Sequence, residues 1–145
     1  MPATPPLALT GVRIADFTQV IAGPYGMQLM AYAGAEVIKV ESIRRPDSFR
    51  QPGYGVYGQG INAARPFAEF NRNKRSVSVD MRTDEGRALI KRLVAVSDVV
   101  VENFSYGVMD RWGFDYPSLD KIAPGLIMLR AQGMGQDGPR RDWVT

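Results

Sequence analysis

Short apolar runs alternate with helix signals along this 145-residue chain, and this alternation constrains its fold more than any other feature. Residues 12–17 and residues 36–40 are each typical of a short buried strand. Between them, Gly23 and Pro24 are expected to open a helix, which Gly34 would end. A strand, a helix and a second strand in this order pair their strands in parallel, with a right-handed crossover.

The same rhythm continues in the second half of the chain. Residues 76–79 alternate like a strand, and Thr83 is expected to cap a helix. That helix is expected to bury one apolar stripe, formed by Ala88, Leu89, Leu93 and Val96. Residues 98–101 hold a continuous valine run that suits a parallel strand buried on both faces. Two short helices and a fifth strand are expected at residues 107–112, 117–122 and 126–129. The pattern predicts an α/β fold with a Rossmann-like open parallel sheet and flanking helices.

Two segments depart from this rhythm. Residues 1–10 are rich in proline and are expected to be loose, whereas residues 11–145 are expected to form the N-terminal part of one large domain. Residues 42–66 contain repeated glycine and proline, and loops of this length usually carry a function. A contact with a ligand or partner is favoured there, and an ordered excursion without function is the alternative.

The absence of cysteine and histidine limits the chemistry of the chain. It excludes disulfides, metal sites built on these residues, and Ser-His or Cys-His catalytic pairs, so no metal is expected. The net charge of +3 favours an anionic partner, with an inert basic surface as the alternative. Nucleic acid is disfavoured because the basic residues are dispersed and accompany no binding motif. With no signal peptide and no apolar run of about 18 residues, a cytoplasmic protein without membrane contact is expected.

Polar residues follow four of the expected strands, at the sheet edge where open α/β proteins bind ligands. Residues 18–24 lead into a helix whose N-terminus favours phosphate or carboxylate, although they lack the G-x-G-x-x-G pattern of dinucleotide binding. Glu41 suggests a ribose contact, and the cations within residues 44–45 and 71–75 suggest phosphate contacts. Residues 103–104 suit a ligand that needs both a hydrogen bond and an apolar contact. Ordinary turns, solvated charges and a core phenylalanine are the alternatives.

Several segments match one protein family in their order and spacing. They are LTGVRIADF at residues 9–17, AGP at 22–24, AGAEVIKVE at 33–41, NRNKRS at 71–76 followed by Asp80, DEG at 84–86, DVVVENF at 98–104, GVMDRWG at 107–113, PGLI at 124–127 and GMGQDGP at 133–139. Together they resemble the opening of the family III CoA-transferases, the CaiB/BaiF family. The resemblance covers nearly the whole chain and does not specify a substrate.

This resemblance implies a Rossmann-like large domain that binds CoA, a smaller domain, and two interlocked subunits in a protein much longer than this chain. The implied CoA contacts are Gln19, Val20, Ile21 and Ala22 after the first strand, Val79 and Arg82 at the nucleotide, Asn103, Phe104 and Ser105 along the pantetheine arm, and Arg111 near the phosphates. The family often carries arginine directly after the glutamate of the second strand. This chain has Ser42 there, so Arg44 or Arg45 is expected to substitute.

The resemblance also implies a reaction, the transfer of CoA from an acyl-CoA to a carboxylic acid through an aspartate-bound anhydride and thioester. The family's aspartate lies downstream of Thr145, so this chain is expected to be an inactive fragment that supplies the CoA-binding part. Asp16 is expected to be structural. The expected partners are acyl-CoA and the acceptor acid, with no tightly bound cofactor and with a homodimer at full length. An α-methylacyl-CoA racemase, which uses histidine and aspartate, and a non-catalytic CoA-binding module are the alternatives.

Overall fold

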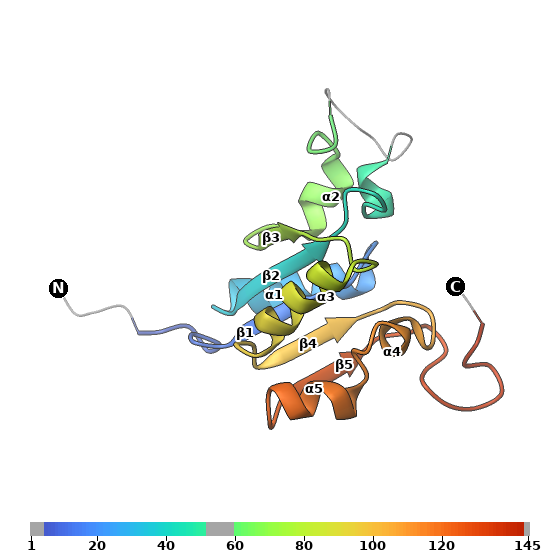
Figure 1. The fold of residues 1–145 in the computed structure, drawn as a ribbon. Coiled ribbons are helices and arrows are strands. Elements are labelled where there is room, and N and C mark those ends of the chain that lie inside the picture. Colours follow the sequence, from blue (N-terminus) through green and yellow to red (C-terminus); the bar gives the residue numbers. More distant parts are fainter. Residues whose placement is uncertain (1–4, 52–59, 144–145) are drawn as a thin grey trace.

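The computed structural model describes residues 5–51 and 60–143. They form one sheet of five parallel strands in the order β3-β2-β1-β4-β5 (Figure 1). The strands are β1 Arg13–Asp16, β2 Glu36–Glu41, β3 Arg75–Ser78, β4 Val99–Glu102 and β5 Ile127–Arg130. The chain first builds outward from β1 to β3 and then returns to place β4 on the other side of β1. The strand order therefore reverses between β1 and β4, which is where such sheets bind ligands.

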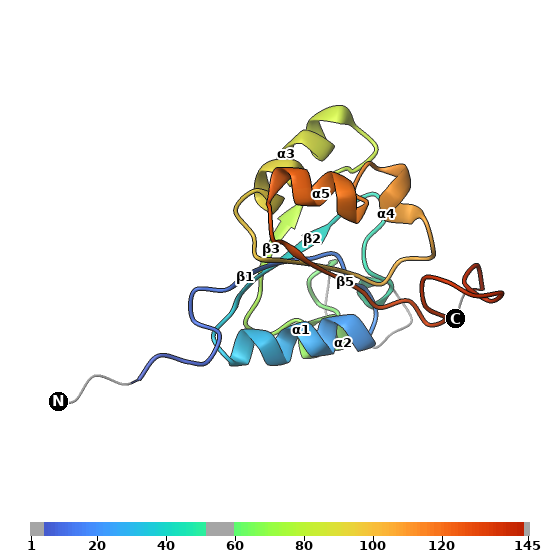
Figure 2. The ribbon, with the colours of Figure 1, turned by 90° about the horizontal axis from the view of Figure 1, so that it is seen from below.

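Helices cover both faces of this sheet (Figure 2). On one face lie α1 Ala22–Tyr32 and α2 Arg65–Phe70, and on the other lie α3 Asp84–Val94, α4 Val108–Arg111 and α5 Tyr116–Ile122. This arrangement confirms the predicted Rossmann-like open parallel sheet with flanking helices. None of the described helices is both long and apolar enough to cross a membrane.

Two apolar cores lie on opposite faces of the sheet, and β4 contributes to both. Val100 packs with Phe114 and Leu119 in the core under α3 and α5. Its neighbour Val101 packs with Met27 in the core under α1. Both valines are fully buried. The continuous valine run is therefore explained by burial on both faces of a central strand.

Helix α3 begins as predicted but buries the predicted stripe only in part, because Leu93 alone of its residues packs against the core. Thr83 caps it, because its hydroxyl oxygen accepts a hydrogen bond from the Gly86 N–H at 3.0 Å. Leu89 and Val96, both expected in the buried stripe, are 45% and 57% exposed. The buried face instead consists of Gly86, Ile90 and Val94. Helix α3 is therefore rotated about its axis relative to the prediction. The close approach of Gly86 to the Asp80 carbonyl explains this rotation, because it turns the Gly86 side of the helix towards the interior.

The segment after β2 is more ordered than an irregular loop. It contains a short 3-10 helix, η1 Ser48–Arg50, and the helix α2, which was not predicted. Helix α2 has six residues, a proline in its first turn and no fully buried side chain. Its sequence therefore carries no apolar stripe from which it could have been identified.

The N-terminal segment is attached to the fold near its end. The Leu9 N–H donates a hydrogen bond to the Ala33 carbonyl at 2.9 Å, and the Leu9 side chain packs on the core under α1. The segment predicted to be loose, residues 1–10, is thus held to the fold at Leu9, while residues 1–4 lie outside the described part of the chain.

Candidate functional site

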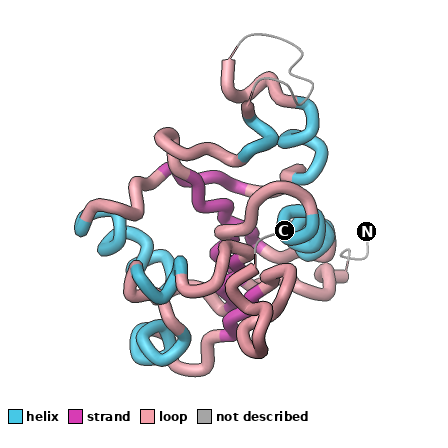
Figure 3. The backbone as a smooth tube through the Cα atoms, turned by 90° about the vertical axis from the view of Figure 1, so that its right-hand side faces the viewer, coloured by secondary structure: helices cyan, strands magenta, loops and turns pink. Residues whose placement is uncertain are grey.

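A cleft of about 610 Å³ lies at the carboxyl edge of the sheet, the edge that Figure 3 faces. Its walls are formed by the end of β2, by the segments that follow β1, β2, β3 and β4, and by α4 with the residue after it, Trp112. Six of the predicted site residues line this sheet-edge cleft: Gln19, Arg44, Val79, Arg82, Phe104 and Ser105. They come from distant parts of the sequence and converge because all the strands are parallel and end at one edge.

The other five predicted residues do not line the cleft, although each neighbours a lining residue or the loop that leads to it. They are Val20, Ile21, Ala22, Asn103 and Arg111. Val20 and Ile21 are 40% and 48% exposed at the start of α1. Arg111 is exposed at the end of α4 and makes no ion pair with a described residue. Val20, Ile21 and Arg111 are therefore accessible beside the cleft without lining it.

The β1–α1 loop, residues 17–21, is fixed by a side chain from the segment that follows β4, the strand beside β1 in the sheet. Asn103 Oδ1 accepts a hydrogen bond from the Gln19 N–H at 2.8 Å, and Asn103 Nδ2 donates one to the Gln19 carbonyl at 2.9 Å. The loop also packs tightly on α1, since a Cβ on Gly23 would lie 2.4 Å from the Thr18 Cβ. Asn103, predicted as a ligand contact, thus positions Gln19 within the cleft wall.

Three arginines give the cleft its positive charge. Asp80 accepts hydrogen bonds from Arg82 at 3.0 Å (Nε) and 2.8 Å (Nη2), and it lies 3.4 Å from Arg44 Nε. The hydrogen bonds from Arg82 hold the pKa of the Asp80 carboxyl far below its ordinary value, and they raise the pKa of Arg82. Arg45 also lines the cleft and makes no ion pair with a described residue. Asp80 therefore gathers cations from the ends of β2 and β3, an arrangement that suits an anionic ligand.

The opposite wall of the cleft is aromatic. Phe104 packs edge-on against Trp112, with ring centroids 5.6 Å apart, and Phe17 completes the wall from β1. Trp112 was not among the predicted site residues, because core packing explains an apolar residue in a short helix equally well. Asp80 was also left out of the site, since an acidic residue in a basic ligand site gives no signal in the sequence alone.

The buried carboxylate of Glu102 holds the backbone of Phe104, one of the aromatic residues of the cleft. Glu102 accepts hydrogen bonds from the Phe104 N–H at 2.7 Å and from Gln132 Nε2 at 2.6 Å. Burial raises the pKa of Glu102, while these hydrogen bonds and the nearby Arg130 act in the opposite direction. Gln132 belongs to the glycine-rich segment after β5, so this contact ties that segment to the cleft wall.

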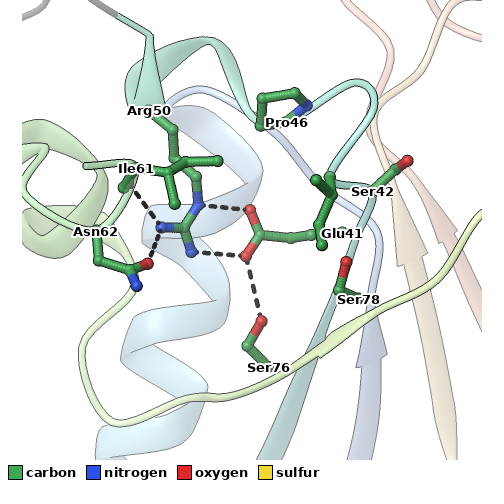
Figure 4. A pocket seen from close by; sticks show the side chains of 9 residues that line it. Glu41, Ser42, Pro46, Arg50, Ile61, Asn62, Ser76 and Ser78 are labelled. Carbon is green, nitrogen blue, oxygen red and sulfur yellow. Dashed lines mark hydrogen bonds and ion pairs between the residues drawn. The ribbon is translucent and has the colours of Figure 1, made fainter.

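Beside the cleft lies a second pocket of about 160 Å³, whose polar side is occupied by internal pairs (Figure 4). Arg50 donates two hydrogen bonds of 2.8 Å to the Glu41 carboxylate and one of 3.0 Å to Asn62 Oδ1. Ser76 donates a further one of 3.2 Å to Glu41. Glu41, which also lines the sheet-edge cleft, thus anchors the segment after β2 through these hydrogen bonds.

The basic stretch at residues 71–75 does not join the site. Lys74 is buried and donates hydrogen bonds of 2.9 Å to Asp16 Oδ2 and to Asn71 Oδ1. Asn73 Nδ2 donates to the Ala31 carbonyl at 2.9 Å, which ties the turn before β3 to α1. Lys74, Asn71 and Asn73 thus make internal contacts, and no residue of this stretch lines the sheet-edge cleft. Asp16 has the structural role expected for it.

The chain is a Rossmann-like α/β domain, and its basic cleft with aromatic residues at the carboxyl edge of the sheet suits an anionic ligand with an apolar part. The chain belongs to CoA-transferase family III, whose family model matches residues 9–145. This match confirms the family that the sequence motifs resemble.

Known proteins of this family are similar over nearly the whole chain. It is 45% identical over 138 residues to the succinyl-CoA–D-citramalate CoA-transferase of Chloroflexus aurantiacus, covering 95% of this chain and 34% of that protein. It is 41% identical over 140 residues to the succinate–glutarate CoA-transferase of Agrobacterium fabrum, covering 94% and 35%. The crystal structure of a CaiB/BaiF family protein from Brucella suis matches with a TM-score of 0.88 and 40% identity, covering 97% and 37%. The chain spans about a third of the length of the curated relatives it matches.

Proposed function

We propose that this chain is the CoA-binding part of an enzyme that transfers CoA between an acyl-CoA and a carboxylic acid. The observation that carries the proposal is the sheet-edge cleft, in which arginines form one wall and aromatic rings the other. CoA has the same two-part character, with a phosphorylated nucleotide at one end and an uncharged pantetheine arm at the other. The relatives described above are both named as CoA-transferases, which favours transfer over racemisation or simple binding.

The proposed roles follow from the positions of the side chains. Arg82 and Arg44, already oriented by Asp80, bind the phosphates, and Arg111 adds charge beside the cleft. Phe104 and Ser105 line the path of the pantetheine arm. The loop at residues 19–22 then lies near the thioester end.

The reacting carboxylate is placed outside the described residues. In the proposed reaction an aspartate attacks the thioester carbonyl, forms an anhydride and releases the CoA thiolate. The thiolate then attacks the aspartyl carbonyl of this anhydride, which forms an enzyme thioester and releases the donor acid as its carboxylate. The acceptor carboxylate attacks the enzyme thioester, forming a second anhydride and freeing the thiolate, which finally attacks the acceptor's carbonyl and regenerates the aspartate. Asp16 does not suit this role because it is fully buried and paired with Lys74. Asp80 is paired with Arg82. This chain's part is to hold CoA so that the thiolate stays near the site after it leaves.

CoA binding to the purified protein, measured by isothermal titration, tests the binding part of the proposal. Arg82→Gln is expected to weaken CoA binding by about tenfold, since a charge-assisted hydrogen bond contributes about 1.5–3 kcal/mol. Pantetheine, which lacks the phosphates contacted by Arg82, is expected to bind the variant and the parent equally well. Arg92→Gln is the matched control, because Arg92 is an exposed arginine in the last turn of α3 and does not line the cleft.

Transfer is tested with the complete gene product, an acyl-CoA and a panel of free carboxylic acids. The expected result is a new acyl-CoA for at least one acid. The absence of CoA binding, or binding that is equally strong in the Arg82 variant, would contradict the assignment of the cleft.

A homodimer is the proposed assembly of the full-length protein, of which this chain would be one part. Ile127 and Leu129 on the edge strand β5 are 63% and 46% exposed, and Tyr25 and Leu29 on α1 are 49% and 45% exposed. Such apolar surface is typical of a face that another polypeptide covers. A single monomeric species in sedimentation velocity across a range of concentrations would contradict this proposal.

A further inference from the structure

Asp47, in the segment that follows β2, reaches the β1–α1 loop through the interior of the protein. Its side chain is 1% exposed. The carboxylate accepts hydrogen bonds from the Val20 N–H at 3.2 and 3.3 Å and from the Phe49 N–H at 3.0 Å. It also forms an ion pair of 3.4 Å with Lys39, whose ammonium group is equally buried. A buried carboxylate thus joins two segments that are 27 residues apart.

Val20, which Asp47 holds, has a backbone conformation that valine rarely adopts. Its φ is +71°, in the left-handed region, where a β-branched side chain is strained. Such a conformation persists only when the surrounding structure imposes it. Here the Val20 N–H is bound by Asp47, while the preceding Thr18 carbonyl accepts a hydrogen bond of 2.5 Å from Lys39 Nζ. The Asp47–Lys39 pair therefore hydrogen-bonds to the loop backbone on both sides of Gln19, at the Thr18 carbonyl and at the Val20 N–H.

The strained turn decides what the loop presents to the cleft. Gln19 lines the cleft, and Val20 and Ile21 are exposed at the start of α1. Asn103 binds the Gln19 N–H and carbonyl from the other side. That carbonyl shares a planar peptide unit with the Val20 N–H bound by Asp47, so Asp47 and Asn103 hold opposite sides of the peptide bond that precedes Val20. If Val20 relaxed to a negative φ, the chain direction would change between Gln19 and α1, and the cleft wall would change with it.

We propose that Asp47, paired with Lys39, is a positioning residue that imposes the left-handed conformation of Val20 and so orders the β1–α1 loop for binding CoA. This inference rests on the proposed function, because it assigns Asp47 to the same cleft. It also gives the segment at residues 42–51 a role, since this segment carries the residue that shapes the loop. Asp47 touches no ligand in this scheme and acts only through the backbone of Val20.

The test combines a substitution that loosens the loop with one that relieves its strain. Asp47→Asn keeps the shape of the side chain and removes its charge. It is expected to weaken CoA binding by roughly tenfold and to speed hydrogen exchange in a peptide covering residues 18–22. Adding Val20→Gly is expected to restore most of the affinity, because glycine adopts positive φ without steric cost. Asp120→Asn, which removes a carboxylate bound to the Gly125 N–H far along the chain, is the matched control and should change neither measurement.

The two measurements separate this inference from the proposed function. Unchanged exchange and unchanged CoA affinity in Asp47→Asn would overturn the inference. A loss of affinity that Val20→Gly fails to restore would also overturn it, since a merely structural role predicts reduced unfolding stability without such rescue. If the parent protein bound no CoA, the proposed function would fall, and the exchange of residues 18–22 would still decide whether Asp47 orders the loop.

Discussion

The buried ion pair of Lys74 and Asp16 gives the most direct test of how the end of β1 is stabilised at the carboxyl edge of the sheet. Their side chains are 1% and 0% exposed. The Lys74 ammonium donates three hydrogen bonds of 2.9 Å, to Asp16 Oδ2, the Pro24 carbonyl and Asn71 Oδ1. Lys74→Met keeps most of the apolar stem and removes all three donors. The Asp16 carboxylate would then remain buried with hydrogen bonds only from Thr18.

Lys74→Met is expected to lower the free energy of unfolding by about 3–5 kcal/mol, the usual cost of removing one partner from a buried ion pair. Desolvation lowers the pKa of Lys74 despite the opposing effect of Asp16, so burying this charge is itself costly. The intact pair therefore adds less to the free energy of unfolding than is lost when one of its two partners is removed. Combining Lys74→Met with Asp16→Asn is expected to recover part of the loss, because no buried charge then remains unpaired.

Urea denaturation at pH 7, followed by circular dichroism, measures these differences. Lys91→Met is the control, because Lys91 is exposed on α3, and it is expected to change stability by no more than about 0.5 kcal/mol. A loss below about 1 kcal/mol for Lys74→Met would refute the reasoning. So would a double variant as unstable as the sum of the two single variants.

Four further substitutions test the packing and the electrostatics of the fold. Gly86→Ala is expected to destabilise by about 1–3 kcal/mol in the same urea assay, because its Cβ would lie 2.1 Å from the Asp80 carbonyl oxygen. Gly26→Ala, in α1 with no atom near the new methyl group, is expected to raise the free energy of unfolding by about 0.5–1 kcal/mol. Equal changes in stability for Gly86→Ala and Gly26→Ala would contradict this reasoning. Phe114→Ala is expected to cost about 3–5 kcal/mol, since its ring is fully buried between helices and sheet, and a midpoint within error of the parent would be inconsistent with that burial. Folding raises the pKa of the Glu102 carboxyl, so Glu102 contributes stability below its unfolded pKa and loses that contribution as pH rises through its folded pKa. The parent protein should therefore gain stability relative to Glu102→Gln as pH falls from 7 towards 4.5. A stability difference that does not change with pH would disprove this reasoning.

The strands and most of the helices were predictable because their signals are local. The valine run at β4, the capping Thr83 and the glycine after α1 each report the conformation of a few neighbouring residues. Helix α2 was missed for the same reason, since it buries no residue fully and its short sequence has no periodicity. The residues that line the cleft were partly predictable, because a parallel sheet brings all strand ends to one edge.

Which charged residues serve the site and which hold the fold was decided only by tertiary contacts. Lys74 stands in a basic stretch that is typical of a solvated turn, yet it is buried against Asp16, 58 residues earlier in the chain. Asp47 lies among prolines and arginines in an apparent loop, yet it binds the backbone of Val20.

The sequence by itself therefore determined the five strands, most of the helices between them, the parallel pairing of the strands and the sheet edge at which the polar residues after them gather. The tertiary structure decided the rotation of α3, the strained turn at Val20 and the internal pairing of Lys74 and Asp47. The physical reason is that periodicity and capping act within one or two turns of chain. The burial of a charge, in contrast, depends on partners that only folding brings within hydrogen-bonding distance.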